Sequence, residues 1–156
     1  MINIEVVSES NLWSKRIKKP DIFFNSLIKT FPKKYRFIKK RVSLTILLSN
    51  NNNIKKLNKK FRNKNKSTDV LSFPTEEKLN IKKSPYIGDI VVSYEHMDKP
   101  NTLSVLEFKN KVTKVFIHGF LHLLGYDHIK LRDFKEMLIE EEKIYKTIET
   151  KIAKLV

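Results

Sequence analysis

The sequence predicts one α+β domain over residues 1–156, in which a mixed sheet of about four strands is packed with helices. Three observations support this class. A length of 156 residues is typical of one domain, and the chain contains no repeat, linker or break in composition. Four short segments carry strand patterns, and longer segments carry apolar residues at helical spacing. With 40% hydrophobic and 31% charged residues, the composition is that of a globular protein with its own core.

The first part of the chain alternates between strand and helix patterns. Residues 2–7 alternate weakly between apolar and polar, which predicts a first strand. Asp21 follows Pro20 and is expected to cap a helix with apolar residues at helical spacing, which Pro32 ends. Regular alternation over residues 42–49 predicts a second strand.

A basic helix and two further strands are expected next. The asparagines at 50–53 offer an N-cap for a short helix over 54–61, whose apolar residues share one face while its lysines occupy the other. Residues 69–73, ended by Pro74, and residues 88–93 have the composition of short strands. These two strands complete the predicted sheet.

Two helices complete the expected fold. Ser104 and Glu107 form a capping-box pattern that opens a long helix, and Gly125 can close this helix in a left-handed conformation. Asp133 and Glu136 repeat the pattern and are expected to cap a final helix.

The composition excludes several classes of protein. The chain has no Cys, which excludes disulfides, thiolate zinc sites and a cysteine nucleophile, and fits a reducing compartment. No signal-peptide pattern is present, and no apolar run approaches the roughly 18 residues that a membrane helix needs. We therefore expect a cytoplasmic protein without a membrane partner.

The positive charge is confined to one part of the chain. Residues 1–66 hold 18 Lys and Arg but only three acidic residues, so they carry the whole net charge of +15, and residues 67–156 are neutral. A uniform bias toward lysine would spread the charge evenly. The segment therefore predicts a basic surface for a polyanion, because Lys and Arg release counterions from phosphates.

Three of the four histidines lie within eleven residues and predict a metal site. His118 and His122 are four residues apart, so on a helix they share one face, and a turn at Gly125 can bring His128 back to them. Three imidazoles without a thiolate suit Zn²⁺ and leave the fourth position open for water, as in catalytic sites. The prediction is one catalytic Zn²⁺ ion.

The same spacing narrows the chemistry. Metzincin peptidases share these offsets but have a glutamate base directly after the first ligand, where this chain has Gly119. A peptidase is therefore disfavoured. A structural zinc would need a fourth ligand, which only His96 could supply among the histidines. A zinc hydrolytic centre on a basic chain favours phosphodiester chemistry on nucleic acid.

The segment His118-Gly119-Phe120-Leu121-His122-Leu123-Leu124-Gly125-Tyr126-Asp127-His128 resembles the signature of the YbeY family, bacterial endoribonucleases of rRNA maturation. Leu57–Arg62, Ser67–Pro74 and Gly88–Ser93 are similar to the family's other motifs, in the same order. Together these motifs span about residues 54–142.

The resemblance implies a single metal-dependent endoribonuclease domain over residues 1–156, with a zincin-like site of three histidines on a long helix. It implies cleavage of single-stranded or ribosomal RNA, in maturation of the 3′ end of small-subunit rRNA and in ribosome quality control. The small ribosomal subunit is then a partner, and DNA is not expected to be one. The metal role falls on His118, His122 and His128, and catalytic roles fall on His118 and Arg62, whose guanidinium can hold a phosphate bidentately.

Several alternatives stay open at the level of sequence. Asp69 and Asp89 each begin an expected strand, where they either orient a histidine or cap the strand. Asp127 is similarly open, Tyr126 is expected to pack, and the general acid is unassigned. The alternative function is an RNA- or ribosome-binding assembly factor with a mainly structural metal.

Overall fold

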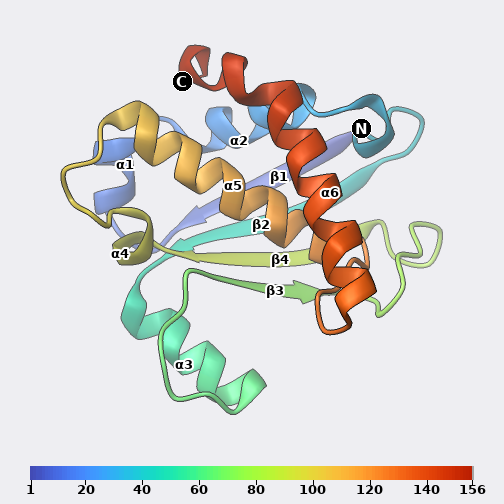
Figure 1. The fold of residues 1–156 in the computed structure, drawn as a ribbon, viewed down its shortest axis with the longest axis horizontal. Coiled ribbons are helices and arrows are strands. Elements are labelled where there is room, and N and C mark those ends of the chain that lie inside the picture. The colour runs from blue at the N-terminus through green and yellow to red at the C-terminus, as the bar shows by residue number, and fades with distance from the viewer. Residues whose placement is uncertain (156) are drawn as a thin grey trace.

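The computed structural model describes residues 1–155 and shows a sheet with helices on both faces (Figure 1). The elements follow the predicted order, with several short helices added. They are β1 (Ile2–Ser8), α1 (Leu12–Arg16), α2 (Pro20–Lys29), η1 (Lys33–Tyr35), β2 (Val42–Ser49), α3 (Asn51–Arg62), β3 (Val70–Pro74), β4 (Tyr86–Ser93), α4 (Tyr94–Met97), α5 (Val105–Leu123), α6 (Leu131–Ile148) and η2 (Glu149–Lys154), where η marks a 3₁₀ helix.

The sheet is mixed and has four strands, which confirms the predicted fold class. Its order is β1-β2-β4-β3. Strands β1, β2 and β4 are parallel, whereas β3 pairs with β4 in the antiparallel direction. Parallel neighbours need crossover connections, and here α1 and α2 lie between β1 and β2, while α3 and the antiparallel strand β3 lie between β2 and β4. Strand β3 is therefore an edge strand, with one side not paired to another strand.

The two faces of the sheet are covered unequally. On one face α2 packs against β1, α5 packs against β3 and β4, and α6 lies over α5. On the opposite face α3 buries Ile54 against Leu71 of β3 and Val91 of β4. The main core thus lies between the sheet and α5, and the smaller cluster under α3 involves β3, β4 and Leu47 of β2.

Aromatic side chains fill the space between α2 and α5. Phe31 and Phe116 lie with ring centroids 6.0 Å apart, and Phe31 meets Phe120 edge to face at 5.7 Å. All three are at least 98% buried. Burial of each such side chain contributes about 1.5–3 kcal/mol. This core holds α5 rigidly against the sheet and so fixes the end of the helix that carries the histidines.

Two of the expected helix caps are wrong. Helix α2 starts at Pro20, which suits a first position because its missing N–H needs no partner there, and Asp21 lies inside the first turn. Helix α6 starts at Leu131, so Asp133 is already helical. Both aspartates favour the helix through its dipole rather than by capping. The caps at Asn50 and Ser104 are confirmed.

The sequence patterns also missed the short helices α1 and α4. Each is about one turn, too short to show a helical period. Helix α1 nevertheless anchors Trp13, which is fully buried and whose Nε1–H donates to the Ser49 carbonyl at 3.0 Å. Ring centroids 5.4 Å apart place Tyr94 of α4 edge to face with it.

Candidate metal centre

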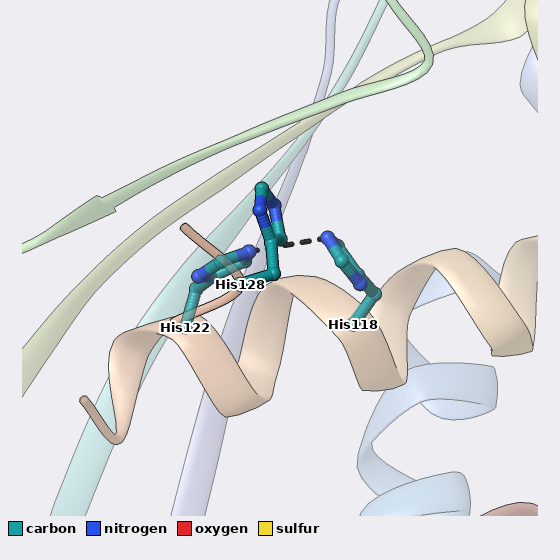
Figure 2. Close-up of side chains that lie close together, drawn as sticks. All are labelled: His118, His122 and His128. Atoms are coloured by element: carbon teal, nitrogen blue, oxygen red, sulfur yellow. Dashed lines mark hydrogen bonds between the residues drawn. The ribbon is translucent and has the colours of Figure 1, made fainter. Parts of the chain in front are cut away.

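The last turns of α5 and the turn that ends it position the three histidines (Figure 2). The N–H of Gly125 donates to the His122 carbonyl and the N–H of Tyr126 donates to the Leu121 carbonyl, both at 3.0 Å. This pair of bonds is a Schellman motif, which needs a left-handed residue, and Gly125 has φ +99°. The predicted glycine cap is confirmed, and the reversed chain brings His128 back over the helix.

The three imidazoles converge on one point. One ring nitrogen from each of His118, His122 and His128 lies within 4.8 Å of the other two. The Nε2 atoms of His118 and His122 are 3.1 Å apart. The first two side chains are half-buried and His128 is exposed, so the cluster opens to solvent on the His128 side.

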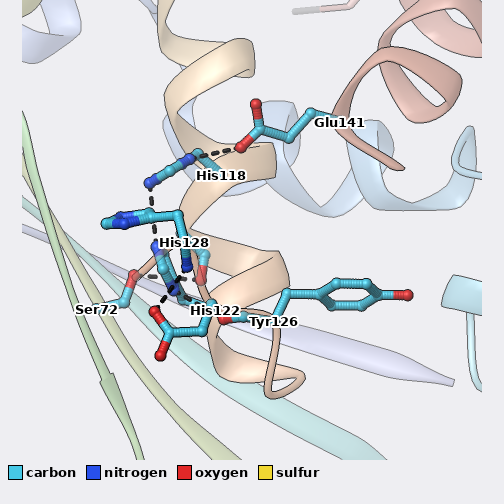
Figure 3. Close-up of polar contacts among 8 residues, drawn as sticks. Ser72, His118, His122, Tyr126, His128 and Glu141 are labelled. Atoms are coloured by element: carbon cyan, nitrogen blue, oxygen red, sulfur yellow. Dashed lines mark hydrogen bonds and ion pairs between the residues drawn. The ribbon is translucent and has the colours of Figure 1, made fainter. Parts of the chain in front are cut away.

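Hydrogen bonds behind the rings fix the tautomers of two histidines (Figure 3). His118 Nδ1 lies 2.5 Å from Glu141 Oε1, and His122 Nδ1 lies 2.9 Å from the Tyr126 carbonyl. Both partners are acceptors, so each Nδ1 carries a proton, and in a neutral ring the Nε2 atom is then the one that can bind a metal. Two such nitrogens 3.1 Å apart need either one proton or a metal ion between them. Two nitrogens at zinc-ligand distance in a tetrahedron are roughly 3.3 Å apart, close to the separation here.

Electrostatics keep His122 in the form that binds metal. Burial lowers the pKa of His122 to about 4, helped by the neighbouring His118 and His128 and opposed by the hydrogen bond to Tyr126. At neutral pH the ring is therefore neutral. A neutral imidazole is the form that coordinates a metal.

Gly119 lets α5 approach the sheet closely, beside the first histidine. A Cβ at this position would lie 3.0 Å from both Ile90 Cγ2 and Ser72 Oγ. The Ser72 hydroxyl instead donates to the Gly119 carbonyl at 3.2 Å. The position that holds the metzincin base thus faces the sheet, and the nearby carboxylate, Glu141, lies behind His118 rather than at the open side of the cluster.

Arg62 is the last residue of α3 and lies at the β3 edge. Its Nη2 donates to the Ser72 carbonyl at 3.1 Å. Ser72 in turn contacts Gly119, the neighbour of His118. Ser72 of β3 therefore connects Arg62 to the helix that carries the histidines. Arg62 itself makes no hydrogen bond to a histidine within the described residues.

The other polar residues considered from sequence have local roles. Asp69 accepts from the backbone N–H of Val70 at 2.8 Å, and Asp89 accepts from the Tyr86 hydroxyl. Asp69 directly precedes β3, but Asp89 lies inside β4 and does not begin it as expected, and neither carboxylate contacts a histidine. His96 contacts a serine hydroxyl and is not part of the three-histidine group.

The sequence patterns do not indicate two groups of the site, the Tyr126 carbonyl and the Glu141 carboxylate. Tyr126 was expected only to pack, and its ring does point away from the histidines, but its carbonyl orients His122 (Figure 3). Glu141 orients His118, and a carboxylate in this role is common behind ligand histidines. Glu141 stands between Glu140 and Glu142, so only the packing of α6 on α5 selects it. Asp127 accepts from the His128 N–H at 2.7 Å and shapes the turn.

Known proteins resemble this chain over nearly its whole length. A family model described as Endoribonuclease YbeY matches residues 8–149. A protein of Pelagibacter ubique named Endoribonuclease YbeY is 70% identical over 153 residues, covering 98% of this chain and all of the relative. One of Borrelia turicatae with the same name is 35% identical, over 89% of this chain and 94% of the relative. The solution structure of TM1509 from Thermotoga maritima aligns with a TM-score of 0.51 and 25% identity, over 98% of this chain and 96% of that one.

Proposed function

The chain belongs to the YbeY endoribonuclease family, and from this premise we propose that residues 1–156 form one zinc-dependent endoribonuclease domain. Its substrate is single-stranded ribosomal RNA, and its task is maturation of the 3′ end of small-subunit rRNA and quality control of ribosomes. The small ribosomal subunit is its partner, and the cytoplasm is its compartment. In residues 1–155 no helix has both the length and the apolar character to cross a membrane.

The observation that carries this proposal is the convergence of three ring nitrogens within 4.8 Å, with the Nε2 atoms of His118 and His122 3.1 Å apart and both Nδ1 atoms held from behind. His118, His122 and His128 would hold the ion. A zinc bound there supplies Lewis-acid polarisation of a phosphate oxygen and activation of a water molecule. Three protein ligands leave room for such a water, and the described residues add no fourth His, Asp or Glu to the cluster.

The chain's own residues bind and orient the RNA. Arg62 uses Nη2 on the Ser72 carbonyl, which holds the guanidinium at the β3 edge while its other N–H groups stay available for a phosphate. Phe61 is 58% exposed beside it, with its ring edge against Phe73. An exposed aromatic ring next to a cation suits an unstacked base, so this edge favours single-stranded RNA over duplex.

The alternative of an assembly factor with a structural metal makes a different prediction for chelation. The core of the fold is built from buried apolar side chains of the sheet, α2 and α5, and does not depend on the histidines. Chelation should therefore abolish RNA cleavage while circular dichroism and RNA affinity stay near their starting values. If chelation unfolds the protein or abolishes RNA binding, the metal is structural and the alternative stands.

The test of the site uses His118→Ala, with His96→Ala as the matched control, because His96 is the one histidine outside the cluster. The metal content of protein purified without chelator, and the cleavage of single-stranded RNA, are measured for both. We expect His118→Ala to lose both properties and His96→Ala to keep both. Wild-type protein without a stoichiometric transition metal would refute the assignment.

A further inference from the structure

We propose that the connection between α2 and β2 forms a second RNA-binding surface, separate from the metal centre, that holds the phosphate backbone of a flanking segment. The inference rests on the proposed function in taking RNA as the polyanion. We call this surface the β1-edge basic surface. It comprises Lys29, Lys33, Lys34, Arg36, Lys39, Lys40 and Arg41.

The charge of this surface is almost uncompensated. Residues 29–41 hold seven Lys and Arg and no acidic residue. Within the described residues, Lys34 alone among them has an ion pair, with Glu140 at 3.3 Å. Arg36 Nε is shielded from solvent and finds no hydrogen-bond partner in residues 1–155. Such a density of unpaired cations destabilises the free protein by repulsion and favours binding of a polyanion.

The surface is also hollowed. A groove of about 910 Å³ runs along the starts of β1 and β2 and is lined by Lys29, Lys39, Lys40 and Arg41. A second groove of about 490 Å³ is lined by Lys33, Lys34, Lys39 and Lys40. The two grooves share Lys39 and Lys40, so they form one basic track with the 55% exposed Ile38 beside it. A positively charged groove that follows the phosphate backbone is one component of sites for single-stranded nucleic acid.

The position of this track separates it from the proposed catalytic edge. The larger groove is lined by residues of β1 and β2, whereas Arg62 contacts β3, at the other edge of the sheet (Figure 1). Three strand spacings amount to roughly 14 Å. Tyr35, which lies in the same connection between α2 and β2, packs on Phe120 of α5, and Phe120 is two residues from His118 and His122 and so lies on the other side of the helix. One RNA would have to be long enough to reach both surfaces.

The test compares two variants with the same change in net charge. The first is Lys39→Gln/Lys40→Gln/Arg41→Gln, whose residues are all exposed. The control is Lys135→Gln/Lys151→Gln/Lys154→Gln, which removes three exposed cations elsewhere. Affinity for a single-stranded RNA of roughly 30 nucleotides, long enough for two sites of ordinary size, is measured against salt concentration. Loss of three phosphate contacts should make the slope of log K against log[salt] shallower by about 2 in the first variant alone.

Cleavage assays keep this inference distinct from the proposed function. An oligonucleotide of about six nucleotides, sized for one site, should be cleaved by the first variant with wild-type kcat and KM. For the long RNA we expect a raised KM with kcat unchanged. If wild-type protein cleaves neither RNA, the proposed function fails, while the binding slopes still test the surface. Equal slopes in both variants would overturn the inference. So would a first variant that binds the RNA like wild type and loses binding only to vesicles of anionic lipid.

Discussion

Removal of the Glu141 carboxylate should weaken metal binding without weakening the fold. Glu141 accepts a hydrogen bond from His118 at 2.5 Å from across the α5–α6 interface. Glu141→Gln keeps an oxygen that can accept this bond but removes the negative charge. Glu141→Ala removes the acceptor altogether. The neighbouring Glu142 is exposed, so Glu142→Gln is the matched control on the same helix.

The size of the effect follows from the kind of bond that is lost. The carboxylate and the imidazole side chains are 26% and 32% exposed, so solvent screens the pair only in part. Hydrogen bonds to a charged partner are roughly twice as strong as neutral ones, which places Glu141→Gln at about a tenfold loss of zinc affinity. Glu141→Ala should cost up to about 100-fold, or about 2.7 kcal/mol.

Competition with a chromogenic chelator measures these affinities directly. Cobalt absorption spectra of the same proteins report whether the geometry around the metal has changed. We expect affinity to fall in the order wild type, Glu141→Gln, Glu141→Ala, with Glu142→Gln indistinguishable from wild type and all four proteins equally stable to urea. Wild-type zinc affinity in Glu141→Ala would show that the hydrogen bond does not orient His118 for a metal, and the reasoning would fail.

Three further predictions concern the rest of the site and its support. Arg62→Lys should lower kcat for RNA cleavage by about 10²–10³ because a point charge cannot replace a fork of donors, whereas Lys64→Gln should have a much smaller effect in the same steady-state assay. Gly125→Ala forces a side chain into φ +99° and should lower the urea midpoint by an amount equivalent to about 1–2 kcal/mol, although no atom lies within 4 Å of the new Cβ; an unchanged midpoint would contradict the need for glycine there. The hydrogen bond from Tyr35, with help from Lys34, lowers the pKa of Glu140 below 4.5, so the stabilisation by the Glu140 carboxylate is present above that pH and is lost as pH falls through the folded-state pKa. The variant Glu140→Gln should therefore lose less stability on acidification than the wild type. Parallel curves of urea midpoint against pH for the two proteins would argue against this account.

The sequence predicts those features that depend on local patterns. Two strands of the sheet are visible as alternation and two as short runs of strand-forming composition, and the Ser104 capping box and Gly125 turn are visible as single residues with special backbone roles. The spacing of the histidines works for the same reason, because a helix turns the separation of His118 and His122 into one face. Local patterns do not resolve that α2 starts at Pro20 and α6 at Leu131, because proline and aspartate are both acceptable on either side of a helix boundary.

Features that arise from packing between distant segments could not be predicted. Glu141 is one of three consecutive glutamates, and only the contact of α6 with α5 decides which of them reaches His118. The role of Tyr126 depends on its carbonyl, which carries no sequence signal. In the sequence, Gly119 indicates only that the peptidase base is missing. The reason for a glycine there is the close approach of Ile90 and Ser72, which the sequence does not show.

The Schellman turn after α5 has a consequence for local dynamics. Its two hydrogen bonds belong to the segment that holds both His122 and its Tyr126 partner. Fraying of this helix end and release of a metal would therefore be one opening event rather than two. Amide hydrogens at residues 125 and 126 should exchange slowly when metal is bound and much faster without it, while those deep in β2 and β4 change little. The end of one helix would then report metal occupancy in a hydrogen-exchange experiment.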